Sequence, residues 1–124
     1  MENIKTDLLI IGAGPGGYVG AIYAKRKGLD VVLVEKENIG GTCLNWGCIP
    51  TKALVRSAEF YNEVLNSKDL GVNLDNPQVD LAKIIDKKDD ITKELVKGID
   101  YLLNKHKVKV IKGEASFKNN NQVN

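Results

Sequence analysis

The feature that most constrains the fold is a pair of apolar runs separated by glycines at the start of the chain. Residues 7–14 (DLLIIGAG) form a continuous apolar run, typical of a strand buried on both faces of a parallel sheet. Residues 15–27 predict a helix with basic residues in its last turn and a stop at Gly28. Residues 30–35 (DVVLVE) predict a second buried strand. The sequence therefore opens with a strand–helix–strand unit of the α/β class.

The glycines between the first strand and the helix have the spacing of a dinucleotide-binding loop. Residues 12–17 read G-x-G-x-x-G in the strand-to-helix context that gives this motif its meaning. Gly12 permits the tight turn, Gly14 lets the backbone approach a pyrophosphate, and Gly17 lets the helix pack closely on the strand. Glu35 ends the second strand, where its carboxylate can accept hydrogen bonds from a ribose diol. The motif does not distinguish NAD from FAD, and glycines that serve only the turn remain the alternative.

Later periodicities predict two more helices and a return to strand. Residues 48–66 predict a helix, and residues 78–105 predict a long amphipathic helix with apolar residues three to four apart. Residues 107–117 predict a strand, and the asparagines at 119–121 predict a hairpin turn. Because the chain ends where a return strand is expected, we expect it to be the N-terminal piece of a longer protein.

Charge and hydropathy exclude several kinds of partner. The net charge of +2 gives no strong electrostatic case for nucleic acid or an anionic membrane. No apolar run approaches the roughly 18 residues of a membrane span, and no signal-peptide pattern is present. A cytoplasmic protein is therefore expected, and in that compartment a disulfide is more often catalytic than structural.

Both cysteines lie in GGTCLNWGCIPTKAL, residues 40–54. Zinc needs about four ligands, and the two cysteines with the distant His106 do not supply them, so no metal is expected. In a regular helix, residues five apart have Cα atoms about 8–9 Å apart, too far for a disulfide. Cys43 and Cys48 can therefore bridge only through a distorted turn, which Asn45 and Gly47 permit.

The residues after the second cysteine favour a redox pair. Pro50 fits the first turn of the helix that follows, so Cys48 lies at a helix N-terminus, where the dipole favours thiolate. Lys52 adds positive charge on the same face. Two reduced cysteines that only pack remain the alternative.

Three stretches, IIGAGPGG, VVLVEKENIGGTCLNWGCIPTKAL and KGEASF, together closely resemble the flavin disulfide reductases of the pyridine nucleotide-disulfide oxidoreductase family. The resemblance implies a Rossmann-like FAD-binding domain with a parallel sheet and flanking helices, here incomplete. Within the family, the cysteine segment looks most like the dihydrolipoamide dehydrogenases. Glutathione and mercuric reductases, which typically have valine after the first cysteine, are the alternative, as is a stand-alone nucleotide-binding redox sensor.

The resemblance also implies roles for individual residues. Cys43 would be the interchange thiol that meets substrate, Cys48 the charge-transfer thiolate that faces the flavin, and Lys52 a neighbour of the flavin N5 edge. Glu35 would bind the adenosine ribose, Lys36 would lie near the adenine, and Ala115 would offer backbone contacts there. The full set of implied FAD contacts is Gly12, Gly14, Pro15, Gly16, Gly17, Glu35, Lys36, Gly41, Thr42, Cys43, Gly47, Cys48, Lys52, Gly113 and Ala115.

The reaction implied by the resemblance is oxidation of protein-bound dihydrolipoamide to lipoamide, with reduction of NAD⁺ through the cysteine disulfide and FAD. Partners would be the lipoyl domain of a 2-oxoacid dehydrogenase or glycine cleavage complex, and a second subunit of a homodimer. Family members carry a second G-x-G-x-x-G for NAD and a dimerisation domain with a His-Glu pair, and this sequence has neither. Residues 1–124 are thus expected to be the N-terminal portion of the FAD-binding domain, not competent alone for the full reaction.

Overall fold

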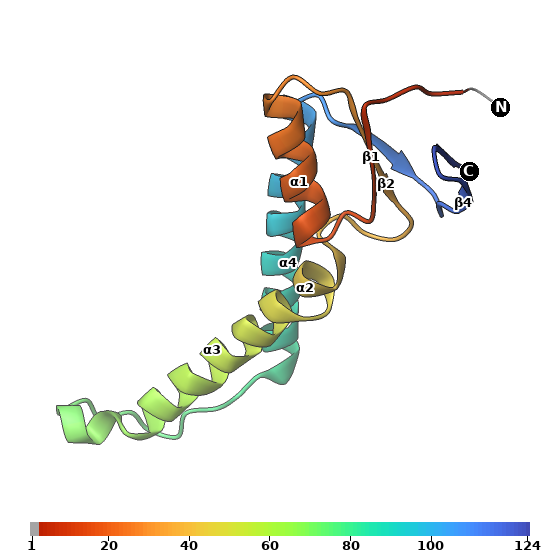
Figure 1. Ribbon diagram of the computed structural model, residues 1–124. Helices are drawn as coiled ribbons and strands as arrows, with labels where there is room; N and C mark the ends of the chain where they lie inside the picture. Colours follow the sequence, from red (N-terminus) through yellow and green to blue (C-terminus); the bar gives the residue numbers. More distant parts are fainter. Residues whose placement is uncertain (1–2) are drawn as a thin grey trace.

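The structure, a computed structural model, describes residues 3–124 (Figure 1). Its main sheet has three parallel strands in the order β1-β2-β3. The strands are β1 (Leu8–Ile11), β2 (Val31–Glu35) and β3 (Lys109–Lys112). Leu8 pairs with Val31, and Val32 pairs with Lys109. All three strands therefore end at the same edge of the sheet, and the α/β prediction is confirmed.

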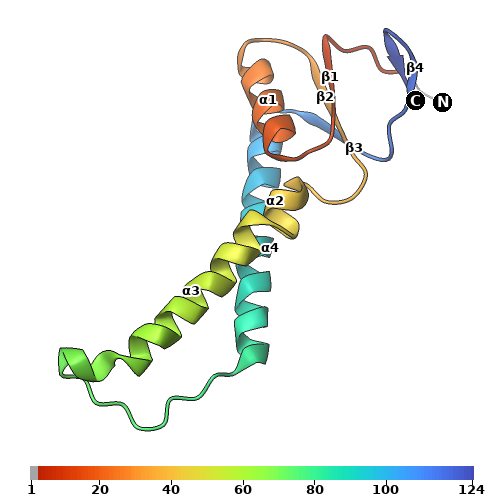
Figure 2. The ribbon, with the colours of Figure 1, turned by 60° about the horizontal axis from the view of Figure 1, so that its bottom comes forward.

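Four α-helices and a short 3₁₀ turn accompany the sheet. They are α1 (Pro15–Arg26), α2 (Gly41–Asn45), α3 (Cys48–Leu65), η1 (Ser67–Leu70) and α4 (Leu81–Lys105). Helices α1 and α4 contact each other and lie on the same side of the sheet, while α3 leads away from it (Figures 1 and 2). No helix in the described part of the chain is both long and apolar enough to cross a membrane.

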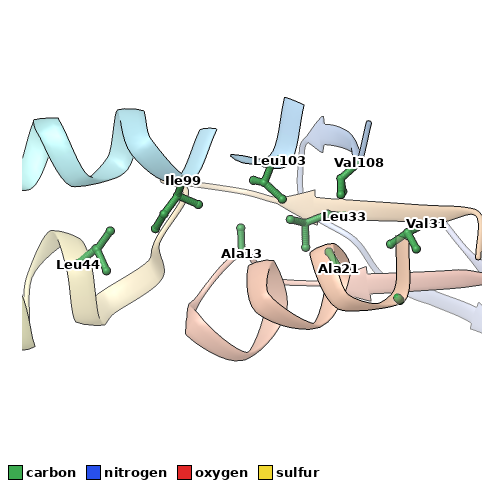
Figure 3. Packing of buried hydrophobic residues seen from close by; sticks show 9 residues of the cluster. Ala13, Ala21, Val31, Leu33, Leu44, Ile99, Leu103 and Val108 are labelled. Carbon is green, nitrogen blue, oxygen red and sulfur yellow. The ribbon is translucent and has the colours of Figure 1, made fainter. Parts of the chain in front are cut away.

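The core lies between the sheet and the two helices α1 and α4. Val31 and Leu33 of β2 and Leu103 of α4 are its largest fully buried side chains. Figure 3 shows Leu33 between Leu103 and Ala21 of α1. Leu44 of α2 belongs to the same cluster. The short helix that carries the first cysteine is therefore anchored in the core by one buried leucine.

Replacing Leu103 by alanine should lower the free energy of unfolding by about 3 kcal/mol, because a fully buried leucine loses its contacts and leaves a cavity. Urea unfolding followed by circular dichroism measures this change. Leu102 is the matched control, since its side chain on the same helix is 41% exposed. Leu102→Ala should cost less than about 1 kcal/mol, and equal losses in the two variants would contradict the proposed core.

Most predicted elements are confirmed, with two corrections. The long helix begins at Leu81 and not at residue 78, because Asp80 caps it by accepting a hydrogen bond from the Lys83 amide at 3.1 Å. The strand predicted over 107–117 is confirmed only for Lys109–Lys112, and its continuation to residue 117 is wrong. The chain leaves the sheet after Lys112, and the outer part forms a separate hairpin.

That hairpin consists of β4 (Phe117–Asn119) and β5 (Gln122–Val123), which pair antiparallel. The turn predicted within residues 119–121 is confirmed. Ser116 and Asn124 exchange backbone hydrogen bonds of 2.9 and 2.8 Å at the open end of the hairpin. This pairing extends the hairpin by one residue on each side, beyond Phe117 and Val123.

Candidate dinucleotide and dithiol site

The glycine loop joins β1 to α1. The space for a side chain is almost absent at Gly17 and open at Gly14 and Gly16. A Cβ added to Gly17 would lie 1.8 Å from the carbonyl oxygen of Gly12, so only glycine allows this helix to pack on this loop. At Gly14 and Gly16 an added Cβ would meet no atom within 4 Å. The loop therefore fits tightly against the protein behind it and leaves its outer face free.

The first turn of α1 has the donor set of an anion site. Gly14 is the N-cap and gives no side-chain cap, Pro15 follows it, and no acidic residue lies in the first turn. Backbone N–H groups and the positive end of the helix dipole are thus available to a phosphate group. These residues fit the pyrophosphate of a dinucleotide.

Glu35 lies at the end of β2 and already touches the glycine loop. One carboxylate oxygen accepts a hydrogen bond from the Ala13 amide at 2.6 Å, and the other accepts one from the Glu37 amide at 2.8 Å. A carboxylate has about four acceptor positions. Two therefore remain for a ribose diol, while the two backbone contacts fix the orientation of the group.

The end of β3 lies beside Glu35. The Gly113 amide donates to the Glu35 carbonyl at 2.9 Å, and Lys36 forms a 3.8 Å ion pair with Glu114. Both charged side chains are exposed, so this pair adds little stability. A cavity of about 340 Å³ opens next to this edge, and Glu35, Asn38, Ile39, Val96, Val110 and Lys112 are among its lining residues.

The cysteine segment is attached directly to the glycine loop. Gly40 donates its amide to the Ala13 carbonyl at 2.8 Å. Gly41 has a positive φ of 59°, and a Cβ added there would lie 2.8 Å from the Cα of Gly14. The Ala13 peptide thus contacts Glu35 through its nitrogen and the cysteine segment through its oxygen.

The two cysteines lie on different helices. Cys43 is in the middle of α2, Cys48 is the first residue of α3, and the helices are separated by Trp46 and Gly47. The predicted break between the cysteines is confirmed at Gly47, but Asn45 is helical and not part of the distorted turn. A Cβ at Gly47 would be 3.1 Å from the Thr42 carbonyl oxygen, so this glycine lets α3 start against α2.

Both thiols are free, with Cys43 half-buried and Cys48 exposed. The pKa of Cys43 is raised from its ordinary value, mainly because its thiol hydrogen-bonds Cys48, and also because of desolvation and the negative charge that Cys48 can carry. A backbone hydrogen bond from Cys48 and the positive charge of Lys52 act in the opposite direction. Cys48 and Lys52 therefore both lie close enough to the Cys43 thiol to change its pKa.

The predicted site residues form one continuous region at the carboxyl edge of the sheet, with Ala115 just beyond β3. Two participants were not foreseen from the sequence: the Gly40 amide and the Asn45 side chain. The Asn45 amide donates to the carbonyls of Ile39 at 3.1 Å and Gly41 at 2.9 Å. Only the paired glycines at 40–41 hinted at a close approach here. Among residues 3–124, no three His, Cys, Asp or Glu side chains are grouped to hold a metal ion.

Known proteins resemble this chain throughout. It is 45% identical over 120 residues to dihydrolipoyl dehydrogenase from Geobacillus stearothermophilus, covering 97% of this chain and 26% of that protein. It is 48% identical over 117 residues to the Zymomonas mobilis enzyme of the same name, covering 94% of this chain and 25% of that enzyme. The chain thus spans about a quarter of the length of these relatives.

A solved structure and a family model complete the comparison. The Cu(II) complex of HOCl-induced flavoprotein disulfide reductase RclA from Escherichia coli has a TM-score of 0.76 and 30% identity, over 94% of this chain and 24% of that one. A model described as pyridine nucleotide-disulphide oxidoreductase matches residues 6–124. Because that model extends over nearly the entire sequence, we conclude that the chain belongs to the pyridine nucleotide-disulphide oxidoreductase family.

Proposed function

We propose that the chain supplies the FAD-binding loop and the redox dithiol of a dihydrolipoyl dehydrogenase. The observation that carries the proposal is the attachment of the segment with both cysteines to a dinucleotide loop, through the 2.8 Å hydrogen bond from the Gly40 amide to the Ala13 carbonyl. The whole reaction, oxidation of protein-bound dihydrolipoamide with NAD⁺ as acceptor, is proposed from the full-length relatives that the chain resembles.

The residues present fit FAD. The open N-terminus of α1 suits a pyrophosphate, and the remaining acceptor positions of Glu35 suit the adenosine ribose. Lys36, Gly113 and Ala115 are part of the same proposal as contacts to the adenine, and the hydrogen bond from the Gly113 amide to the Glu35 carbonyl supports it. Bound FAD would pass an electron pair from the dithiol to nicotinamide, since a dithiol does not itself donate a hydride.

The cysteines perform the thiol chemistry in two exchanges. A dihydrolipoyl thiolate attacks the sulfur of Cys43 in the oxidised pair, the Cys43–Cys48 bond breaks, and Cys48 leaves as thiolate. The second dihydrolipoyl thiolate then displaces Cys43, which closes the lipoyl disulfide and leaves both protein sulfurs reduced. The substrate loses two electrons and the cysteine pair gains them. Lys52 favours the anionic form of Cys43 by its positive charge.

The partners follow from this chemistry. A lipoyl group on the lipoyl domain of a 2-oxoacid dehydrogenase or glycine cleavage complex would reach the pair from the side of Cys43. NAD⁺ as co-substrate, a homodimeric assembly and a cytoplasmic location are part of the same proposal, and they rest on the relatives that the chain resembles.

Binding of FAD can be followed through Trp46, the only tryptophan of the sequence, which lies between the two cysteines and is 57% exposed. Titration with FAD should quench its fluorescence, because a flavin placed against residues 41–48 lies within energy-transfer range of the indole. FMN, which has no adenosine, should bind at least roughly tenfold more weakly, since it cannot use Glu35. Unchanged fluorescence with FAD, together with no flavin co-eluting on gel filtration, would reject flavin binding by this chain.

A further inference from the structure

The side chain of Asn45 has an unusual position in the cysteine segment. It is half-buried at the end of α2, and its single amide nitrogen donates to two backbone carbonyls, Gly41 at 2.9 Å and Ile39 at 3.1 Å. Gly41 begins α2, and Ile39 precedes the helix. One side chain therefore ties the end of α2 both to its beginning and to the strand-to-helix connection.

This tie lies between the glycine loop and the thiols. The peptide after Ile39 is fixed to the loop, because the Gly40 amide donates to the Ala13 carbonyl at 2.8 Å. Asn45 itself follows Cys43 by two residues and precedes Cys48 by three. The connection between the glycine loop and the two cysteines thus includes the Gly40–Ala13 backbone hydrogen bond and the two hydrogen bonds of the Asn45 amide.

Helix α2 needs such a tie because it has only five residues. A helix of this length is not stable by itself and keeps its conformation through tertiary contacts. Leu44 supplies one of them by burial in the core, and α2 also packs against α3 and α4. The Asn45 amide adds a polar tie from the end of the helix to its beginning, and this tie restricts the direction in which Cys43 points.

We propose that Asn45 is a positioning residue that holds α2 so that Cys43 faces Cys48, and thereby sets the equilibrium between the dithiol and the disulfide. The proposal rests on the proposed function, because it assumes that the two sulfurs exchange a disulfide. Preorganisation of the reduced pair raises the effective concentration of one thiol toward the other. Loss of the amide therefore makes the protein disulfide easier to reduce.

Equilibration with glutathione measures this effect without flavin or substrate. In that reaction the two protein thiols lose two electrons and two protons to form the disulfide, and one glutathione disulfide becomes two glutathione molecules. The oxidised fraction is read by alkylation and mass spectrometry over a series of glutathione ratios. Asn45→Ala should lower the equilibrium constant for oxidation about tenfold, which raises the reduction potential by about 30 mV. Asn45→Asp, which keeps the shape but removes both donors, should lower it at least as far.

Asn66→Asp is the matched control. The Asn66 amide also donates to the carbonyl four residues earlier, Asn62 at 2.8 Å, but at the far end of α3. In the Asn66→Asp variant, the equilibrium constant for oxidation of the cysteine pair should stay within twofold of that of the original chain. An effect in Asn45→Asp without one in Asn45→Ala would assign the change to charge and overturn the proposal.

The remaining outcomes separate this proposal from the function on which it rests. An Asn45→Ala equilibrium constant within twofold of the original overturns the positioning role and leaves the proposed function intact. An unmodified chain that forms no disulfide between Cys43 and Cys48 rejects the function itself. Circular dichroism checks folding, and an Asn45→Ala variant that unfolds would contradict a role confined to α2.

Discussion

Replacing Cys48 by alanine should prevent the reduced chain from reducing lipoamide. The rate at which dihydrolipoamide is formed should fall roughly 10³-fold or more. The reduced chain gives two electrons to lipoamide only if a second thiol resolves the mixed disulfide formed on the first. Without Cys48, the adduct on Cys43 can be displaced only by the second thiol of the lipoyl group, which closes the lipoyl disulfide again and transfers no electrons. Mass spectrometry should find an internal disulfide in the original chain after reaction with lipoamide, and no internal disulfide and no dihydrolipoamide in the variant.

The same variant should make Cys43 more reactive toward iodoacetamide. The pKa of Cys43 is raised mainly by the hydrogen bond from its thiol to Cys48, so removal of that partner lowers the pKa. More thiolate is then present at a given pH, and the alkylation profile moves to lower pH. Lys52→Gln should move it in the opposite direction, because the lysine charge lowers the pKa of Cys43. Superimposable profiles in all three proteins would mean that the two thiols do not interact.

Elements that depend on their own residues, such as the strands, the glycine loop and the helix ends, could be predicted from the sequence. The apolar runs at the strands, the glycine loop and the stop at Gly28 each follow from local rules, since a parallel strand needs apolar side chains on both faces and a tight turn needs glycine. The start of α3 at Cys48 also follows, because Gly47 and Pro50 mark it within a few residues. These elements are encoded by the residues that form them.

Features that depend on distant contacts could not be predicted. Helix α2 has no periodic pattern of its own, and it is held by the core contact of Leu44 and the amide of Asn45. The strand predicted over 107–117 failed beyond Lys112 for the same reason, because its outer part pairs with the chain end and not with β2. The Gly40–Ala13 bond joins residues that no local rule connects.

Replacing Gly17 by alanine should lower the free energy of unfolding by about 3 kcal/mol or more and abolish flavin binding. The new methyl would overlap the Gly12 carbonyl oxygen at 1.8 Å, and that oxygen belongs to the backbone and cannot rotate away. Either the loop moves or α1 separates from β1. Urea unfolding and the Trp46 titration with FAD measure the two effects in one protein.

Gly98→Ala is the matched control, because it makes the same chemical change inside a helix where no atom lies within 4 Å of the added methyl. There alanine should stabilise the chain by about 0.5–1 kcal/mol through helix propensity alone. The two substitutions should thus change the free energy of unfolding in opposite directions. The difference between the two changes measures the cost of the steric overlap at Gly17. A Gly17→Ala variant as stable as Gly98→Ala would show that α1 does not pack against Gly12. In that case the packing of α1 on Gly12 would not fix the conformation of the glycine loop. The position of the Ala13 carbonyl, to which the cysteine segment is attached, would then not be fixed by this packing either.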